Sequence, residues 1–194
     1  IYEQKFHSYR DSEGKMHSGK PVAPLTEIGR TRRQGSKISF LPDKEVFETL
    51  EMNYDIIVKR LRELAYLNRG VLFRILDERE RGGQKQAEFK FDGGLSDFVR
   101  YLNEDKTALY DEPLHFKGSK EGIQVEIAFQ HNDGYSESIF SYVNNIPTTE
   151  GGTHETGFKA ALTKILNDYC RKNGILKDKD PSLSGEDFRE GLTA

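Results

Sequence analysis

The chain has 194 residues, of which 35% are hydrophobic and 31% are charged. That length suits one medium domain, or one small domain and part of another, because single domains usually run to roughly 100–200 residues. With 29 Lys and Arg residues against 32 Asp and Glu residues, the composition excludes a histone-like polycation and an acidic tail, so any contact with nucleic acid has to be local.

The cysteine content and the two ends of the sequence bear on where the protein is located and on whether it is part of a longer chain. Cys170 is the single cysteine, no run of about 18 apolar residues occurs, and no signal peptide is recognisable, so we expect a soluble intracellular protein. The sequence begins at Ile1 without methionine and ends at Ala194 without a polar tail. Because native termini usually fray into polar residues, we expect a piece of a longer chain, with a trimmed complete domain as the alternative.

Residues 1–42 carry the pattern of β-structure. Apolar and polar residues alternate over 1–6, a turn is predicted at 11–14, and further strands are predicted at 25–28 and 37–41. The basic residues around the segment between the last two strands predict a solvated hairpin tip rather than a phosphate site; they are Arg30, Arg32, Arg33 and Lys37.

The hydrophobic period changes after Pro42. Apolar residues from Tyr54 to Ala65 recur at the spacing of one helix face, which predicts an amphipathic helix over residues 53–68. Asn53 is the expected N-cap and Gly70 the expected stop. We place a domain transition at this helix, with one domain at 1–52 and a second at 53–194.

Strand and helix patterns then alternate. Strands are predicted at 71–76 and 88–91, joined by a turn through Gly82-Gly83, and a short helix is predicted at 95–102. The alternating residues 123–129 are predicted to form a hairpin with residues 138–146.

The C-terminal part is predicted to be mainly helical. A long helix is expected to begin at Gly151-Gly152-Thr153, with Thr153 as its cap, and to stop at Asn173-Gly174. Ser184 followed by Asp187 predicts a capping box and a further short helix. All elements together predict an α+β fold.

The polar residues show no complete active site. Five histidines are scattered without metal-ligand spacing, and a single cysteine argues against a structural zinc site. Cys170 adjoins an apolar helical stripe, which predicts a small buried hydrophobe rather than a nucleophile. No Walker-type loop or dinucleotide fingerprint occurs. The glycines before His154 could present backbone N–H groups to an anion, but a tight turn is the favoured interpretation.

One stretch has a local excess of positive charge. Residues 59–90 hold nine Lys and Arg residues against five acidic residues. Ordinary solvated surface is the favoured interpretation, and contact with DNA is the alternative.

The segment from Asn144-Asn145-Ile146-Pro147 through Gly151-Gly152-Thr153-His154 closely resembles the second, or transducer, domain of the bacterial DNA gyrase B family. Segments 59–68, 91–95, 101–103 and 183–194 resemble the same domain, so the resemblance covers almost the whole chain in order. Topoisomerase IV shares the Gly-Gly-Thr-His element, but the turn at 132–135 and the ending from Ser182 are more similar to gyrase.

This resemblance implies a type II topoisomerase that couples ATP hydrolysis to the passage of one DNA duplex through another, giving negative supercoiling. In the family, a Bergerat (GHKL) ATP-binding domain precedes a transducer that contains a left-handed βαβ crossover. Residues 1–52 resemble the last strands of the GHKL sheet. Residues 53–194 resemble the transducer, truncated before its Gln-Thr-Lys loop.

The resemblance also implies a few nucleotide-binding residues. Gly35-Ser36-Lys37-Ile38 matches the family's Gly-Thr-x-Val strand at the adenine pocket, so Gly35, Ser36 and Ile38 are the expected nucleotide contacts. Ser36 keeps the hydroxyl of the family's threonine and loses a methyl group. The family's general-base Glu, its Mg²⁺-binding Asn and its lid match no residue here. We therefore expect the isolated chain to be inactive and to bind neither ATP nor Mg²⁺ tightly.

The expected partners follow from the same resemblance. They are the A subunit of gyrase, a second copy of the B subunit on ATP-driven dimerisation, and double-stranded DNA, in the bacterial cytoplasm and without a membrane. Some of the four candidates Arg60, Arg62, Arg69 and Arg74 are expected to face the DNA cavity. The B subunit of topoisomerase IV and a non-enzymatic DNA-binding or interaction module with the same fold are the alternatives.

Overall fold

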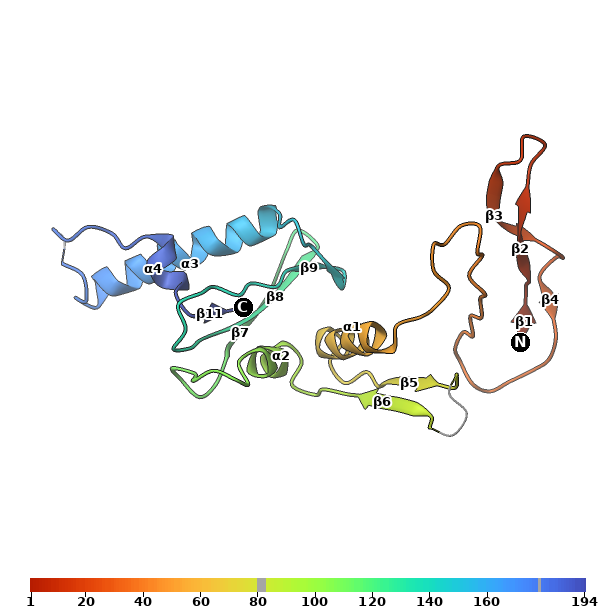
Figure 1. The fold of residues 1–194 in the computed structure, drawn as a ribbon. Helices are drawn as coiled ribbons and strands as arrows, with labels where there is room; N and C mark the ends of the chain where they lie inside the picture. Colours follow the sequence, from red (N-terminus) through yellow and green to blue (C-terminus); the bar gives the residue numbers. More distant parts are fainter. Residues whose placement is uncertain (80–82, 178) are drawn as a thin grey trace. The chain divides into compact units, whose positions relative to one another are not determined.

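The computed structural model describes residues 1–79, 83–177 and 179–194 (Figure 1). The chain divides into two compact units, Ile1–Asn53 and Tyr54–Ala194.

The first unit is built from two short antiparallel ribbons. Strand β1 (Tyr2–Glu3) pairs with β4 (Thr26–Glu27), and β2 (Phe6–Arg10) pairs with β3 (Met16–Pro21). The carboxylate of Asp11 accepts hydrogen bonds from the backbone N–H groups of Glu13 (3.0 Å) and Lys15 (2.9 Å), which closes the β2–β3 turn. The predicted β-structure over residues 1–28 is therefore confirmed, with different strand bounds.

The predicted strand at 37–41 is wrong, because residues 28–53 form no strand. A strand is stabilised by a neighbour that completes its hydrogen bonds and covers its apolar face. No other segment of the first unit pairs with 37–41, and the side chains of Ile38 and Leu41 are 86% and 91% exposed. The basic cluster at 30–37 accordingly lies in an open loop and not at a hairpin tip.

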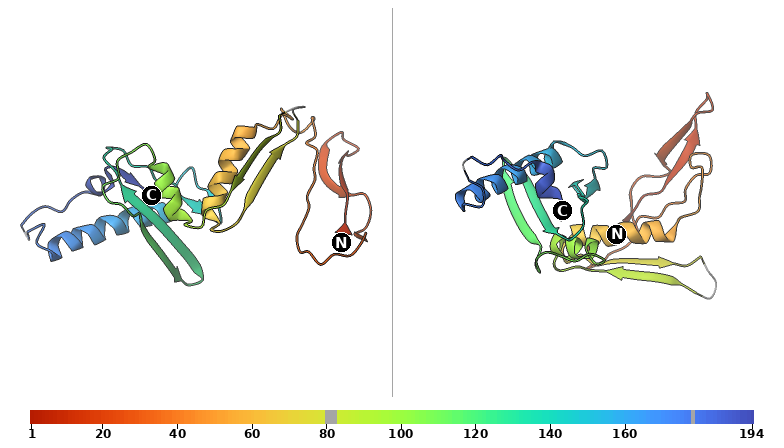
Figure 2. Two further views of the ribbon diagram at one scale, coloured as in Figure 1. Left: turned by 90° about the horizontal axis from the view of Figure 1, so that it is seen from below. Right: turned by 60° about the vertical axis from the view of Figure 1, so that its left-hand side comes forward.

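The second unit begins with helix α1 (Tyr54–Leu67), which packs against the hairpin formed by β5 (Phe73–Asp77) and β6 (Lys85–Phe89), as Figure 2 shows. Helix α1 ends where the Asn68 amide caps the Leu64 carbonyl oxygen at 2.7 Å and Gly70 takes a φ of 77°. The predicted helix and the strand pair are confirmed, and the second strand begins three residues earlier than predicted. Gly82 of the predicted turn lies outside the described residues.

Helix α2 (Leu95–Leu102) confirms the predicted short helix and buries Phe98 and Val99. Its core contact with α1 is aromatic. The Tyr66 ring stacks on Phe91 at 3.7 Å and on Phe98 at 5.0 Å between ring centroids. Such stacked pairs add to the stabilisation that burial alone provides.

A three-stranded antiparallel sheet follows, in the order β11-β8-β7. Strands β7 (Leu114–Lys120) and β8 (Ile123–His131) are joined by the two-residue turn Glu121-Gly122, with φ values of 52° and 81°. Positive φ at both turn residues is the geometry that matches the twist of a hairpin. The hairpin partner of β8 is therefore β7, which precedes it in the chain, and the predicted hairpin with residues 138–146 is wrong.

Strand β11 (Leu192–Thr193) lies between the two segments that are predicted to pair. It is antiparallel to β8 on one side, and on the other it runs parallel to residues 138–140, where the Ser138 N–H donates to the Leu192 carbonyl at 2.7 Å. Both β11 side chains are fully buried. The remainder of the predicted strand forms a separate hairpin, β9 (Tyr142–Val143) with β10 (Ile146–Pro147).

Helix α3 (Thr153–Lys172) connects residues 138–140 to β11, which gives a βαβ unit with parallel strands. It contributes Leu162 to the core with Phe129 and Leu192. The predicted end at Asn173 is confirmed. Thr153 is not the cap, because Gly152 occupies that position and no side chain caps the helix.

Two smaller predictions near the C-terminus have different outcomes. Helix α4 (Gly185–Arg189) begins with the predicted capping box, in which the Ser184 and Asp187 side chains each accept a hydrogen bond from the other's backbone N–H group. Cys170 is half-buried and not fully buried, because α3 is covered on only part of its apolar stripe. Ile165 and Tyr169 on that stripe are exposed.

Candidate functional site

The residues expected to contact a nucleotide lie in the open loop of the first unit. Gly35, Ser36 and Ile38 are all exposed, and a Cβ atom built on Gly35 would meet nothing within 4 Å. The described residues of the first unit bring no second polar side chain into a hydrogen bond with Ser36. The Ile38 side chain, the expected apolar wall, is 86% exposed.

Arg60 and Arg62 both lie on α1, but their guanidinium groups make contacts in different places. Arg60 pairs with Glu63 and donates to the backbone carbonyl oxygen of Asn145 at 2.5 Å. Arg62 donates to the Tyr101 hydroxyl at 3.0 Å. Residues two apart on a helix point to different sides, so the two guanidinium groups do not form one basic patch.

The other two candidate arginines are exposed. Arg69 follows the end of α1, and no other described residue pairs with its guanidinium group. Arg74 on β5 donates to the Glu88 carboxylate at 2.5 Å, directly across the hairpin on β6. Of the four arginines, Arg69 is thus the one whose guanidinium group is both exposed and without a partner among the described residues. Arg81, from the same basic stretch, lies outside the described residues.

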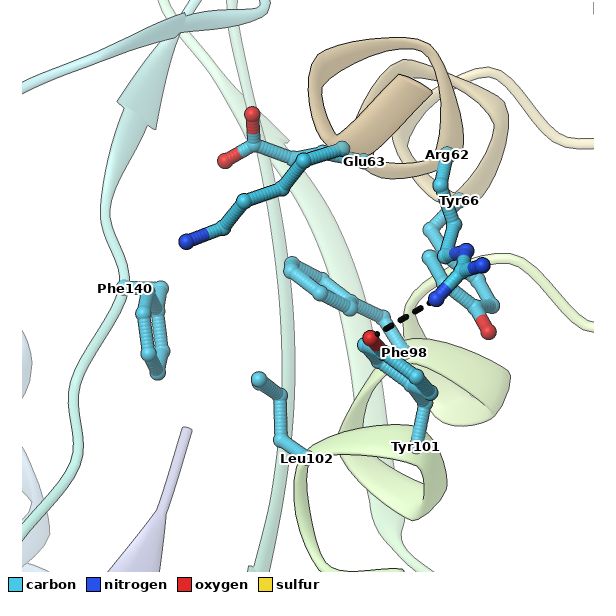
Figure 3. Close-up of a pocket in the computed structure, with 8 residues that line it drawn as sticks. Arg62, Glu63, Tyr66, Phe98, Tyr101, Leu102 and Phe140 are labelled. Carbon is cyan, nitrogen blue, oxygen red and sulfur yellow. Dashed lines mark hydrogen bonds between the residues drawn. The ribbon is translucent and has the colours of Figure 1, made fainter. Parts of the chain in front are cut away.

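A pocket of about 300 Å³ lies between α1, α2 and the segment that carries Phe140 (Figure 3). Half of its lining residues are aromatic, and three charged residues of α1 also line it. The lining residues are Lys59, Arg62, Glu63, Tyr66, Phe98, Tyr101, Leu102 and Phe140.

The electrostatics of this pocket come from α1. The Arg62 guanidinium lies over the Tyr101 ring at 5.4 Å and over the Phe89 ring at 5.2 Å, which favours the cation through the ring quadrupoles. Burial raises the pKa of Tyr66 to about 12, so its hydroxyl stays protonated at neutral pH. The lining contains no histidine, cysteine or serine.

A buried polar network, not anticipated from the sequence, fixes β11 to β8 and to the end of α2. The Thr193 hydroxyl donates to the Asn103 side-chain oxygen at 2.6 Å and accepts from the Asn132 amide at 3.2 Å. Asn103 also donates to the Gln130 side chain at 3.1 Å. Every member is buried and bonded, so the network holds one register of the sheet. Nothing in the local pattern marks these residues, because their partners are distant in sequence.

The described residues hold neither a metal-binding cluster nor a membrane-spanning helix. No group of three His, Cys, Asp or Glu side chains among them lies close enough to ligate a metal ion. None of their helices is long and apolar enough to cross a bilayer. At the start of α3, His154 contacts the Thr148 hydroxyl at 3.1 Å, which is consistent with the turn interpretation of the glycine pair.

The family model for DNA gyrase B matches residues 94–194, more than half of the chain. The chain is 51% identical to the B subunit of DNA gyrase from Halalkalibacterium halodurans over 93% of its own length and 28% of that protein. It is 50% identical to the B subunit of DNA topoisomerase 4 from Enterococcus faecalis, over 91% of the chain and 26% of that protein. The chain therefore spans less than a third of either relative.

A solved structure shares the fold. The 43K ATPase domain of Thermus thermophilus gyrase B, in complex with an aminocoumarin, superposes with a TM-score of 0.72 at 36% identity, covering 91% of this chain and 48% of that one. Sequence and structure agree on the α+β architecture that the resemblance implied. This chain is a member of the DNA gyrase B family.

Proposed function

We propose that this chain is part of the ATPase subunit of DNA gyrase, a type II topoisomerase that couples ATP hydrolysis to DNA strand passage and negative supercoiling. The observation that carries the proposal is the 51% identity to the B subunit of a DNA gyrase over 93% of the chain. The similarity to a gyrase B ATPase domain supports it at the level of the fold.

Within the parent protein, we assign residues 1–52 to the last strands of the ATP-binding domain and residues 53–194 to the transducer. The two compact units, which meet between Asn53 and Tyr54, support this assignment. The βαβ unit in the second of them, with α3 as its helix, is the feature expected of a transducer.

Gly35, Ser36 and Ile38 are the proposed adenine-side contacts for ATP, with Mg²⁺ bound by residues outside this chain. The exposure of all three supports a role that needs further polypeptide to complete the pocket. The isolated chain is then inactive. ATP hydrolysis by the purified 194-residue chain above a buffer control, abolished by Ser36→Ala, would overturn this assignment.

The proposed partners are the A subunit of gyrase, a second copy of the B subunit and double-stranded DNA, in the bacterial cytoplasm. Exposed cations lower the free energy of DNA binding by displacing condensed counterions. By this criterion Arg69 is a better DNA-cavity residue than Arg60 and Arg62, whose guanidinium groups are engaged within the second unit. Arg74 is exposed but paired with Glu88.

The B subunit of topoisomerase IV is the second candidate, because the identity to the Enterococcus faecalis protein is 50%, close to the 51% for the gyrase protein. The two are separated by activity. The full-length protein, reconstituted with the A subunit from the same genome, is expected to introduce negative supercoils into relaxed plasmid with ATP.

Each other outcome of this assay selects a different function. Efficient ATP-dependent decatenation without negative supercoiling would identify topoisomerase IV. The absence of both activities, and of ATP hydrolysis, would identify a non-enzymatic module that shares the fold.

A further inference from the structure

Helix α1 is joined to the turn between β9 and β10 by a group of polar side chains, which we call the α1–turn clamp: Arg60, Glu63, Asn68, Tyr142 and Asn145. Glu63 accepts hydrogen bonds from Arg60 and from the Tyr142 hydroxyl. Arg60 also donates to the Asn145 backbone carbonyl at 2.5 Å, and the Asn145 amide donates to the Asn68 side-chain oxygen at 2.9 Å. The helix is therefore held to the turn both at its middle and at its C-terminal end.

The clamp is shielded enough to be stronger than a surface ion pair. The Arg60 and Glu63 side chains are 35% and 23% exposed. Burial raises the pKa of Tyr142, and the hydrogen bond to Glu63 raises it further, so the hydroxyl stays a donor at all physiological pH values. Charge-assisted hydrogen bonds in such a setting are stronger than those between neutral groups.

The turn itself has an uncommon backbone. Asn144 and Asn145 both have positive φ, at 50° and 67°, a region that residues with a Cβ rarely occupy and asparagine tolerates best. Arg60 bonds to the carbonyl of one of these residues, so the clamp supports this conformation directly. A shift of α1 would therefore displace a turn whose backbone has few alternative conformations.

The same hairpin is bonded to the start of α3 at its other end. The Ser141 hydroxyl lies 2.6 Å from the Thr148 hydroxyl and donates to the Glu155 carboxylate at 3.3 Å. Thr148 also contacts His154 at 3.1 Å. Hydrogen-bonded contacts thus link α1 through the β9–β10 hairpin to the first turn of α3.

We propose that the α1–turn clamp transmits displacements of α1 to α3 and thereby couples ATP turnover to strand passage. Helix α1 is the first element after the first unit in the chain, so the covalent connection from that unit enters the second unit at Tyr54. Domain movements act on packed elements as rigid bodies. Arg60 and Glu63 on α1, and Asn68 directly after it, all bond to the hairpin. Arg60 is then a positioning residue and not a DNA contact. The inference rests on the proposed function.

The test is Glu63→Gln in the full-length protein, assayed with the A subunit of gyrase and plasmid DNA. We expect DNA-independent ATP hydrolysis within about twofold of the wild type, and a fall of about two- to thirtyfold in supercoils introduced per ATP hydrolysed. Glu88→Gln is the matched control. It also removes an acid paired with a candidate arginine, Arg74, but in a hairpin outside the clamp, and should leave the ratio unchanged.

The substitution separates the two roles of Arg60. If Arg60 faces DNA, removing its acidic partner frees its charge, so DNA-stimulated hydrolysis and supercoiling rise together. If Arg60 acts in the clamp, the ratio of supercoils to ATP falls. An unchanged or increased ratio in Glu63→Gln would overturn the proposal.

Tyr142→Phe is the second variant, because it removes only the hydroxyl and keeps the packing. A smaller loss of coupling is expected, and the double variant should lose less than the product of the two single losses, since both act through one contact. Thermal unfolding of each variant verifies folding, and Tyr142→Phe decides the question if Glu63→Gln does not fold. A wild type without ATP-dependent supercoiling refutes the proposed function. A wild type that supercoils, with variants that match it, refutes the clamp alone.

Discussion

The two units use similar sequence patterns and reach different degrees of burial. Every buried hydrophobic residue among those described lies in the second unit, where α1, α2 and α3 cover their neighbours. In the first unit, Phe6, Ile38 and Phe40 alternate with polar residues as strand residues do, yet they are 56%, 86% and 75% exposed. An alternating pattern is compatible with a β-strand. The strand forms and is buried only where another segment pairs with it and covers its apolar face.

The largest effect is expected when a buried side chain of the second unit is shortened and leaves a cavity. Leu192→Ala should lower the free energy of unfolding of the second unit by about 2–5 kcal/mol, because Leu192 is fully buried and its neighbours cannot all collapse into the cavity. Leu41→Ala, at a side chain that is 91% exposed, should change it by less than about 0.5 kcal/mol. Urea unfolding of the 194-residue chain measures both. An equal loss of unfolding free energy in the two variants would show that Leu41 is as well buried as Leu192.

A smaller effect is expected from the buried network. Thr193→Val keeps the shape and removes the hydroxyl that Asn103 and Asn132 share, so about 1–3 kcal/mol of stability should be lost. Thr26→Val is the matched change in the first unit, where the exposed hydroxyl donates to the Pro24 carbonyl at 2.9 Å. There we expect less than about 0.5 kcal/mol. The same unfolding experiment would contradict the network if Thr193→Val were silent.

The response to acid should also be traceable to the second unit. Hydrogen bonds from Lys159 and then Arg189 hold the pKa of Glu137 below its usual range. A lowered folded-state pKa adds stability above the unfolded value of about 4.3, and that stability is lost as the pH falls through the lowered pKa. Because the Glu137 side chain is 38% exposed, the contribution should stay below about 1 kcal/mol.

Glu137→Gln tests this contribution. The variant should unfold at a lower temperature than the wild type at pH 7, and the two should converge as the pH falls below the lowered pKa of Glu137. Melting temperatures at a series of pH values measure the difference. A gap that stays constant from pH 7 to pH 3 would assign the loss to packing rather than to ionisation.

The sequence predicts those parts of the fold that local spacing controls. Helices α1, α2 and α3 and the Ser184 capping box are all found, because their signals lie within a few turns of chain. The pairing of β8 with β11 was not predictable in this way. Strand β11 has only two residues and comes from the far end of the chain, so no local pattern shows that it inserts beside β8.

The candidate site shows the same difference between local patterns, which the sequence reveals, and contacts between distant residues, which it does not. A sum of charges over residues 59–90 marks a basic stretch, but it cannot show that Arg60 binds Asn145 or that Arg74 faces Glu88. The local sequence does hold one signal against the predicted strand over 138–146. Asn144-Asn145 between two short apolar runs favours a turn with positive φ, which argues against a continuous strand over 138–146.

The smallest prediction concerns the first unit alone. Asp11→Ala removes the acceptor for the Glu13 and Lys15 backbone N–H groups and the 2.6 Å contact with His17. These contacts are local and solvent-accessible, so hydrogen exchange should speed up within residues 11–17. The unfolding transition of the second unit should stay where it is, because its core contains no residue from this hairpin. Hydrogen exchange followed by NMR separates the two units. Loss of protection in α1 or α3 would show that the β2–β3 hairpin stabilises the second unit, and would remove the contrast between a covered and an uncovered sheet.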